Sequence, residues 1–147
     1  MLINMKQEEK DLLLKDLCSR LTYGVKVKFG DSKPALLTVI EHDEFGWQIG
    51  SEDEFGGMIT IIDNVKPYLF PLSSMTEEQK NECFKGIPLE IDKYGDIAVK
   101  DDLYGGSQYT DLEIYLKVIN WLLKNHFDIY GLIPMGLAID ATNLNVY

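Results

Sequence analysis

The sequence has few cysteines and lacks a long apolar segment. Only two of its 147 residues are cysteines, Cys18 and Cys83, and both lie among apolar neighbours at helical spacing. We therefore expect two buried free thiols in a reducing compartment rather than a disulfide framework. No apolar run reaches the roughly 18 residues of a membrane-spanning helix, and the first ten residues become charged too soon for a secretory signal. These absences predict a soluble, cytoplasmic protein with no membrane association.

Basic residues are scarce beside acidic ones, and the acidic ones are clustered. Lys and Arg number 14 against 24 Asp and Glu, which gives a formal net charge of -10. Between residues 41 and 54 there is no Lys or Arg, and the carboxylates there are Glu41, Asp43, Glu44, Glu52, Asp53 and Glu54. Such a surface repels phosphate backbones, so nucleic acid is an unlikely partner. The simplest interpretation is that these are solvated acidic loops that maintain solubility.

Two segments, at about residues 5–21 and 111–125, have the 3.6-residue apolar spacing of amphipathic helices. We therefore expect an N-terminal helix and a long helix in the C-terminal half, and a helix-start signal predicts a short middle helix that ends at about residue 85. Thr76 with Gln79, or Ser74 with Glu77, forms a capping box before the middle helix, and Thr110 or Asp111 caps the long one. The apolar face of the long helix is broad enough to leave a homo-oligomer contact open.

Short alternating segments predict strands between these helices. Four of them, at 25–29, 35–42, 47–49 and 58–62, form an antiparallel β-meander, for which a small SH3-like barrel is one possible arrangement. The stretch 63–72 contains two prolines and is expected to run extended outside any central strand. A hairpin at 87–99 and a short strand at 137–139 complete an α+β fold in a single domain spanning residues 1–147.

The residues that supply catalysis in other proteins are few and scattered. His42 adjoins Glu41, Asp43 and Glu44, but neighbouring strand residues point to opposite faces and the spacing fits no common metal motif, so we expect no metal site. His126, Asp128 and Cys83 contain the groups of a thiol nucleophile site without any local signature of one. A His at a helix C-terminus is also favoured by the helix dipole. We expect no catalytic residues and no cofactor.

Three blocks of the chain are rich in turn and packing residues, and they lie at 17–27, at 65–78, and at 121–128 together with 131–133 and 136–138. Together they resemble a family of small uncharacterised proteins of gut anaerobic bacteria, often encoded among prophage and mobile-element genes. The resemblance implies a bacterial or phage cytoplasmic protein. It implies no activity and no site residue.

The charge clustering favours a non-enzymatic interaction or accessory module. In this interpretation the acidic loops flank Trp47 and bind a basic partner protein, with the aromatic side chain supplying binding energy. One alternative is a hydrolase or small-molecule binder with a pocket around His126, Asp128 and Tyr130. Another is a nucleic-acid binder using a basic patch, which would consist of Lys26, Lys28, Lys33 and Lys66.

Overall fold

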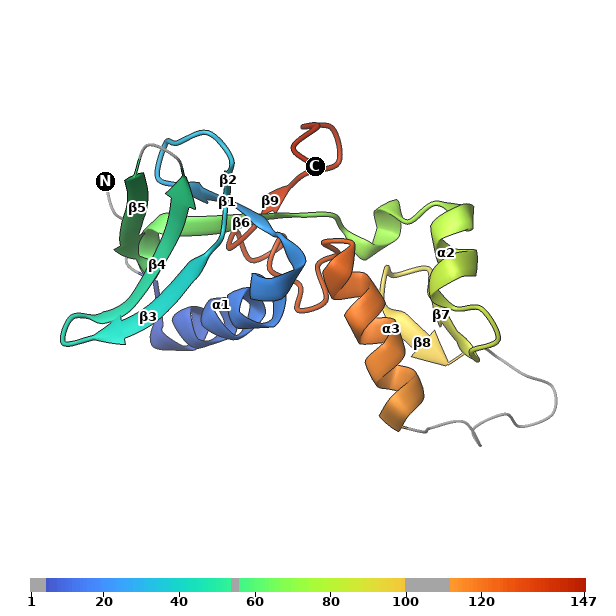
Figure 1. Cartoon of the computed structure of the whole chain (residues 1–147). Helices are drawn as coiled ribbons and strands as arrows, with labels where there is room; N and C mark the ends of the chain where they lie inside the picture. Colours follow the sequence, from blue (N-terminus) through green and yellow to red (C-terminus); the bar gives the residue numbers. More distant parts are fainter. Residues whose placement is uncertain (1–4, 54–55, 100–111) are drawn as a thin grey trace.

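The computed structural model describes residues 5–53, 56–99 and 112–147 and has an α+β fold, as predicted (Figure 1). The helices are α1 (Gln7–Arg20), α2 (Glu77–Cys83) and α3 (Leu112–Lys124), with short 3-10 turns η1 (Leu21–Tyr23), η2 (Ile62–Asn64) and η3 (Leu72–Ser74). The strands are β1 (Lys26–Phe29), β2 (Ala35–Leu36), β3 (Val39–Asp43), β4 (Gly46–Asp53), β5 (Gly56–Ile61), β6 (Val65–Leu69), β7 (Leu89–Ile91), β8 (Ile97–Val99) and β9 (Ile139–Asp140).

The predicted meander is present as the antiparallel sheet β3-β4-β5. A second sheet has the order β2-β1-β6-β9, and the predicted strand at 35–42 is divided between the two sheets as β2 and β3. The bend lies at Leu37 and Thr38, whose amides donate to the carbonyls of Val25 and Gly50 respectively. The segment from β2 to β3 therefore pairs first with β1 and then with β4, as a bent strand does in a small barrel. No ladder joins β5 to β6 within the described residues, so their pairings do not close the barrel.

One expectation about the proline-rich stretch is wrong, because β6 is an internal strand. It pairs antiparallel with β1, with Pro67 opposite Val27, and parallel with β9. The parallel ladder begins only at Tyr68. At Pro67 the strand therefore has one ladder neighbour, and a position on an open edge tolerates the missing amide hydrogen.

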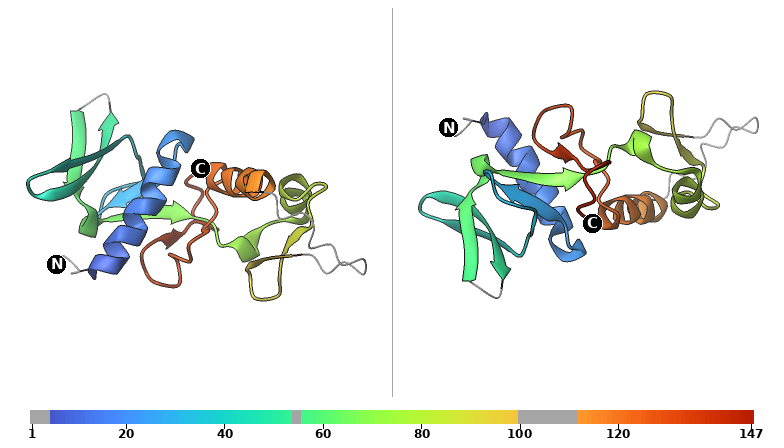
Figure 2. Two further views of the ribbon diagram at one scale, coloured as in Figure 1. Left: turned by 90° about the horizontal axis from the view of Figure 1, so that it is seen from below. Right: turned by 90° about the horizontal axis from the view of Figure 1, so that it is seen from above.

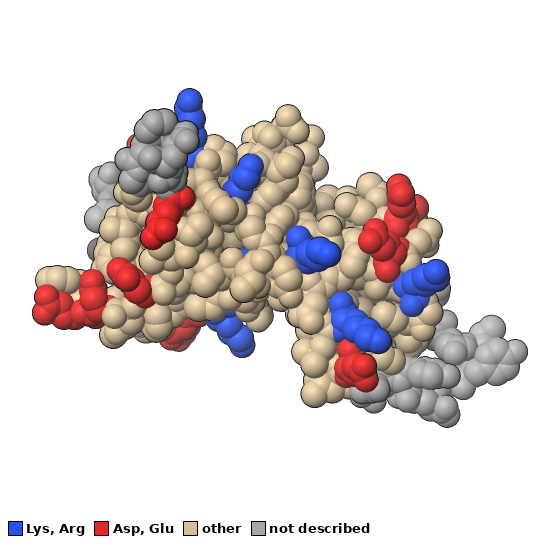
Figure 3. Space-filling model, in the orientation of Figure 1, with Lys and Arg blue, Asp and Glu red and all other residues tan. Residues whose placement is uncertain are grey.

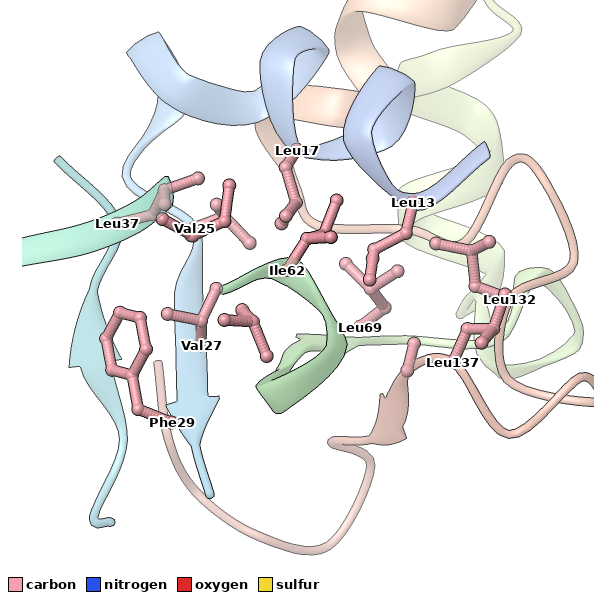
Figure 4. Packing of buried hydrophobic residues seen from close by; sticks show 13 residues of the cluster. Leu13, Leu17, Val25, Val27, Phe29, Leu37, Ile62, Leu69, Leu132 and Leu137 are labelled. Atoms are coloured by element: carbon pink, nitrogen blue, oxygen red, sulfur yellow. The ribbon is translucent and has the colours of Figure 1, made fainter. Parts of the chain in front are cut away.

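The first hydrophobic cluster lies between α1 and the strands (Figure 4). Leu17 projects from α1 on the side of Val25, which directly precedes β1, and Leu13 projects on the side of Leu69. Helix α1 gives way to η1 and then to Gly24, whose φ of +75° places it in the left-handed conformation that glycine adopts without strain. This turn directs the chain from the helix into β1.

A second cluster is formed by α2, the β7-β8 hairpin and α3. These elements make up a second lobe, which lies beside the first lobe of α1 and the two larger sheets (Figures 1 and 2). Thr76 caps α2, since its hydroxyl accepts the Gln79 amide and the Gln79 side chain accepts the Thr76 amide, as one of the predicted capping boxes requires. Helix α3 packs through Val118, Leu122 and Leu123. The expected caps Thr110 and Asp111 lie outside the described residues. The expectation of a single domain stays a prediction.

A buried ion pair links the two lobes. Asp16 and Arg20, one turn apart on α1, are both fully buried, and Arg20 Nε donates to Asp16 Oδ2 at 2.9 Å. Arg20 Nη2 donates to the carbonyl of Phe127 at 2.6 Å. Phe127 belongs to the second cluster. Burial raises the pKa of Asp16 even though Arg20 opposes the shift. The polar pair thus occupies the buried face of α1.

The expectation for Cys18 is wrong for the same reason. Helix α1 turns Asp16 and Arg20 inward with Leu13 and Leu17, at the i, i+3, i+4, i+7 spacing of one face. Cys18 is exposed in consequence, whereas Cys83 is buried as expected. In the described part of the chain, no helix has the length and apolarity needed to cross a membrane.

Replacing Arg20 alone should strongly destabilise the protein. Arg20→Met leaves the Asp16 carboxylate buried without its partner, and such changes cost about 3–5 kcal/mol. We expect the double variant Asp16→Leu/Arg20→Met to recover most of this loss, because it removes the uncompensated charge. Urea unfolding of the three proteins measures both effects. An Arg20→Met protein as stable as the parent would contradict this role for the pair.

Candidate functional site

The tip of the β3-β4 hairpin is built by the turn residues that the sequence places there. Asp43 Oδ1 accepts the amide hydrogen of Phe45 at 2.8 Å, which fixes a tight turn. Gly46 has a φ of +104°, which is accessible to glycine at little cost. The turn leaves Phe45 projecting from the hairpin with 78% of its surface exposed. A large apolar side chain therefore stands at the end of the sheet.

Trp47 and His42 form a cross-strand pair just behind the tip. They are directly opposite in the β3-β4 register, with ring centroids 4.9 Å apart in an edge-on arrangement. Trp47 remains 41% exposed. Trp47 is therefore accessible, and its position is held by the strand register and by the His42 ring.

A groove separates these aromatic residues from α1. Its volume is about 530 Å3. One wall comes from Gln7, Lys10 and Leu14 of α1, and the other from His42, Phe45 and Trp47. Asp63 lies at the groove, accepting from the Met5 amide and pairing with Lys10 at 3.4 Å. The groove therefore combines an apolar aromatic wall with polar groups of both signs.

The acidic residues of the hairpin do not share the face of Trp47. Strand side chains alternate between faces, so Glu41 and Asp43 point away from the face that His42 and Trp47 share. Glu44 lies in the turn, and all three carboxylates are exposed. Figure 3 shows acidic side chains gathered at the hairpin end of the molecule. Glu41 and Asp43 are thus near Trp47 along the strands but lie on the opposite face of the sheet.

The second acidic group lies at the opposite end of β4. Glu52 is exposed and lies opposite Gly57 in the β4-β5 register. It follows Trp47 by five residues, which is a separation of roughly 17 Å along a strand. Asp53 closes the β4-β5 ladder opposite Gly56, and Glu54 lies outside the described residues. Of the two acidic groups predicted to flank Trp47, only the group at 41–44 lies near it along the strands, and Glu41 and Asp43 of that group lie on the other face of the sheet.

The described residues contain no group of three or more His, Cys, Asp and Glu side chains arranged to hold a metal ion. Glu41 and Asp43 alternate with His42 across the sheet, which keeps these side chains apart. The arrangement at residues 41–44 therefore offers exposed negative charge rather than a set of converging ligands.

The residues of the alternative site have structural contacts. The buried carboxylate of Asp128 accepts the amides of Leu132 and Ile133, both at 2.9 Å, which holds the turn after α3. Burial, with Glu82 nearby, raises the pKa of Cys83 to about 12, so its thiol stays protonated near neutral pH. The ammonium group of Lys15 lies 5.6 Å from the centre of the Tyr130 ring. These contacts account for Asp128 and Tyr130 without a reaction.

His126, two residues after the end of α3, has a backbone conformation unusual for a residue with a side chain. Its φ is +65°, and the amides of His126 and Phe127 donate to the carbonyls of Leu123 and Leu122, which is the Schellman pattern. Its ring stacks on that of Tyr147 at 3.8 Å between centroids. Burial, assisted by Arg20 and Lys26, lowers the pKa of His126 to about 4. His126 is therefore neutral in the folded protein over most of the pH range.

Lysines gather on the other sheet. Lys28 of β1 is directly opposite Lys66 of β6, so two of the four lysines of the expected basic patch are neighbours. Lys26 instead donates to the carbonyl of Val146 at 2.6 Å, with its ammonium group near the Tyr147 ring. The structure brings together only part of the patch that a nucleic-acid binder needs.

The buried pair Asp16 and Arg20 was not expected from the sequence. The signal was their i, i+4 spacing in the register of Leu13 and Leu17, but charged residues are rarely buried and the spacing also fits an exposed pair. Arg20 Nη1 and Asp16 Oδ1 have no hydrogen-bond partner among the described residues. The pair is a structural link in this protein, and its geometry assigns it no reaction.

We expect His126 to make stability depend on pH between 6.5 and about 4. In that window the unfolded chain protonates the imidazole and the folded protein does not, so stability falls as the pH falls from 6.5 toward 4. His126→Asn keeps a residue that tolerates positive φ and removes the titrating group. Urea unfolding across this window should show a smaller loss for the variant. Parallel pH profiles of the two proteins would contradict the expectation.

Trp47 should report the acidic surroundings of the hairpin. In a Trp121→Phe variant, which leaves Trp47 as the single tryptophan, fluorescence quenching by caesium should exceed quenching by iodide, each relative to free N-acetyltryptophanamide. The reason is that nearby carboxylates attract cations and repel anions within about 8–10 Å at moderate salt. Trp47→Phe retains Trp121, which is half-buried and stacked on Phe127 away from the acidic hairpin, and serves as the control. Preferential quenching by iodide would show that no net negative field reaches Trp47.

Comparison with known proteins adds no relative. No family model matches the chain, and no curated protein or solved structure matches it significantly.

Proposed function

We propose that this chain is a non-enzymatic interaction module whose acidic β3-β4-β5 sheet binds a basic partner protein. The observation that carries the proposal is that the charged side chains of this sheet are all negative. From Pro34 to Val65 the sequence contains no Lys or Arg, and the exposed carboxylates of Glu41, Asp43, Glu44 and Glu52 all belong to β3, β4 or the turn between them. A sheet of this kind attracts a positively charged surface and repels an acidic one.

The hairpin also offers apolar groups that can contribute binding energy. Phe45 and Trp47 are exposed at its end, and aromatic residues are enriched among those that dominate protein interfaces. Both line the groove against α1, so a partner side chain can enter between the hairpin and the helix. Charge on the outer face would speed association, while the aromatic wall would slow dissociation.

The cellular setting is part of the same proposal. The resemblance described for the three sequence blocks favours an accessory or regulatory protein of bacterial or phage origin that acts in the cytoplasm. A basic partner in that setting includes proteins that bind DNA, whose phosphate-binding surfaces are positively charged. An acidic sheet could then compete with DNA for such a surface.

The alternative of a hydrolase or small-molecule binder around His126 and Asp128 has less support. Both oxygens of Asp128 are used by backbone amides, and the Cys83 thiol has a raised pKa. The groove at Trp47 is lined by other residues. Catalysis from Asp128 would require breaking the two hydrogen bonds that hold the turn at Leu132 and Ile133.

The proposal is tested by reversing charge on the hairpin. The variant Glu41→Lys/Asp43→Lys/Glu44→Lys should lose a partner that the tagged parent captures from its host, because attraction becomes repulsion. The matched control Glu77→Lys/Glu78→Lys/Glu82→Lys changes the same net charge on exposed residues of α2 and should retain that partner. Capture is quantified by mass spectrometry, and the purified complex should weaken as salt is raised.

Two results would contradict the proposal. One is capture of the same partner by the parent and the hairpin variant in equal amounts, because charge at the tip would then be irrelevant. The other is a partner with an acidic surface whose affinity does not change with salt. Salt-dependent binding to DNA that is lost in Lys28→Glu/Lys66→Glu would instead favour the nucleic-acid interpretation.

A further inference from the structure

Strand β5 has a free edge. It pairs with β4 on one side, and within the described residues no strand pairs with its other side. It lies at the outer margin of the first lobe in Figure 1. An unpaired edge presents a row of backbone N–H and C=O groups, which is a template for another extended chain.

The two edges of the β3-β4-β5 sheet differ in their protection. Proteins protect exposed edges with charged side chains, proline or very short strands. Edge strand β3 carries the charges of Glu41 and Asp43, whereas β5 is six residues long and contains neither charge nor proline. Met58 and Ile59 of β5 are 47% and 53% exposed, and they point to opposite faces because they are adjacent. The β5 edge is therefore the one open to strand addition.

Side chains beside β5 define what an added strand would contact. Gly57, Ile59 and Glu52 share one face, because Gly57 is directly opposite Glu52 and strand side chains alternate. An aliphatic side chain opposite Ile59 would cover its exposed surface. Gly57 has no side chain, so a long basic side chain opposite it can cross β5 and reach the carboxylate of Glu52.

Charge decides between a second copy and a different partner. Two copies joined through β5 would bring together two sheets that have several carboxylates each and no Lys or Arg. Like charges across an interface oppose association. A basic segment meets no such repulsion and gains from the field that would repel the second copy.

We propose that β5 binds an extended segment of a basic partner as an added antiparallel strand, with an aliphatic residue opposite Ile59 and a Lys or Arg opposite Gly57. The proposal rests on the proposed function and specifies its binding mode. In the antiparallel orientation the segment carries, from N- to C-terminus, an aliphatic residue, any residue and then the basic residue. Backbone pairing supplies affinity, and the alternate side chains supply specificity.

The probe is the fluorescein-labelled peptide Ser-Ile-Thr-Val-Thr-Lys-Ser, whose Kd for the full chain is measured by fluorescence anisotropy. Ile59→Lys places a charge on the edge and should weaken binding at least about tenfold. Leu116→Lys adds the same charge at an exposed position of α3, in the second lobe, and should leave the Kd within about twofold. Circular dichroism checks that both variants keep the parental fold.

Two further experiments test the backbone pairing and the charge pair separately. One changes only the peptide backbone, and the other exchanges the charges of Glu52 and the peptide lysine. A peptide of the same sequence with N-methylated alternate amides cannot complete the ladder and should not bind measurably. Glu52→Lys should weaken binding of the Lys peptide and restore binding of the peptide in which Glu replaces Lys, because the pair is exchanged rather than lost. This rescue identifies Glu52 as the residue that the basic side chain contacts.

Several outcomes would overturn strand addition. The first is equal binding by the N-methylated peptide or by Ile59→Lys, and the second is no binding of the Lys peptide to the parent. A concentration-dependent dimer in sedimentation that is lost in Ile59→Lys would assign the edge to a second copy instead. Retention of the native partner by Ile59→Lys, with loss in the hairpin charge variant, would refute strand addition and leave the proposed function standing.

Discussion

The arrangement of the two lobes depends on the buried guanidinium group of Arg20, which would cost free energy if it lacked partners. Arg20 reaches from α1 to the carbonyl of Phe127 while Asp16 neutralises it, so one side chain joins the first helix to the segment that follows α3. Beside this contact the amide of Phe70 donates to His126, and the amide of Asp128 donates back to Phe70. The ion pair need not add net stability to be decisive. Its partners must be in place for either cluster to close without leaving a buried charge unpaired.

The same contact explains why α3 ends as it does. Phe127 must present its carbonyl to Arg20 and its ring to Trp121 and Phe70, so the helix has to stop and turn just before it. The left-handed residue that produces the turn is His126, where glycine would be less strained. Stacking of its ring on Tyr147 offsets that strain. Tyr147 in turn accepts the Lys26 amide and donates to the Tyr68 carbonyl, which ties the turn to β1 and β6.

Local patterns in the sequence predicted the elements well, and the long-range contacts poorly. The three helices, the meander, the Thr76 cap and the 87–99 hairpin follow from periodicity and turn residues, which act within a few positions. The burial of Asp16 and Arg20, the exposure of Cys18 and the internal position of β6 depend on partners up to 107 residues away. At residues 41–54 the composition predicted an acidic, aromatic surface. It was the pairing of His42 with Trp47 that fixed which side chains share a face.

The register of one sheet therefore assigns different properties to its surfaces. Alternation places the aromatic pair toward the groove at α1 and the carboxylates of Glu41, Asp43 and Glu52 on the other face. The charges proposed to attract a basic partner also protect the β3 edge against unwanted pairing. Because β5 lacks that protection, selectivity at its edge has to come from the surrounding field, which repels acidic strands and second copies of the chain. In the proposed binding mode, one distribution of charge both attracts the partner and restricts which strand is added.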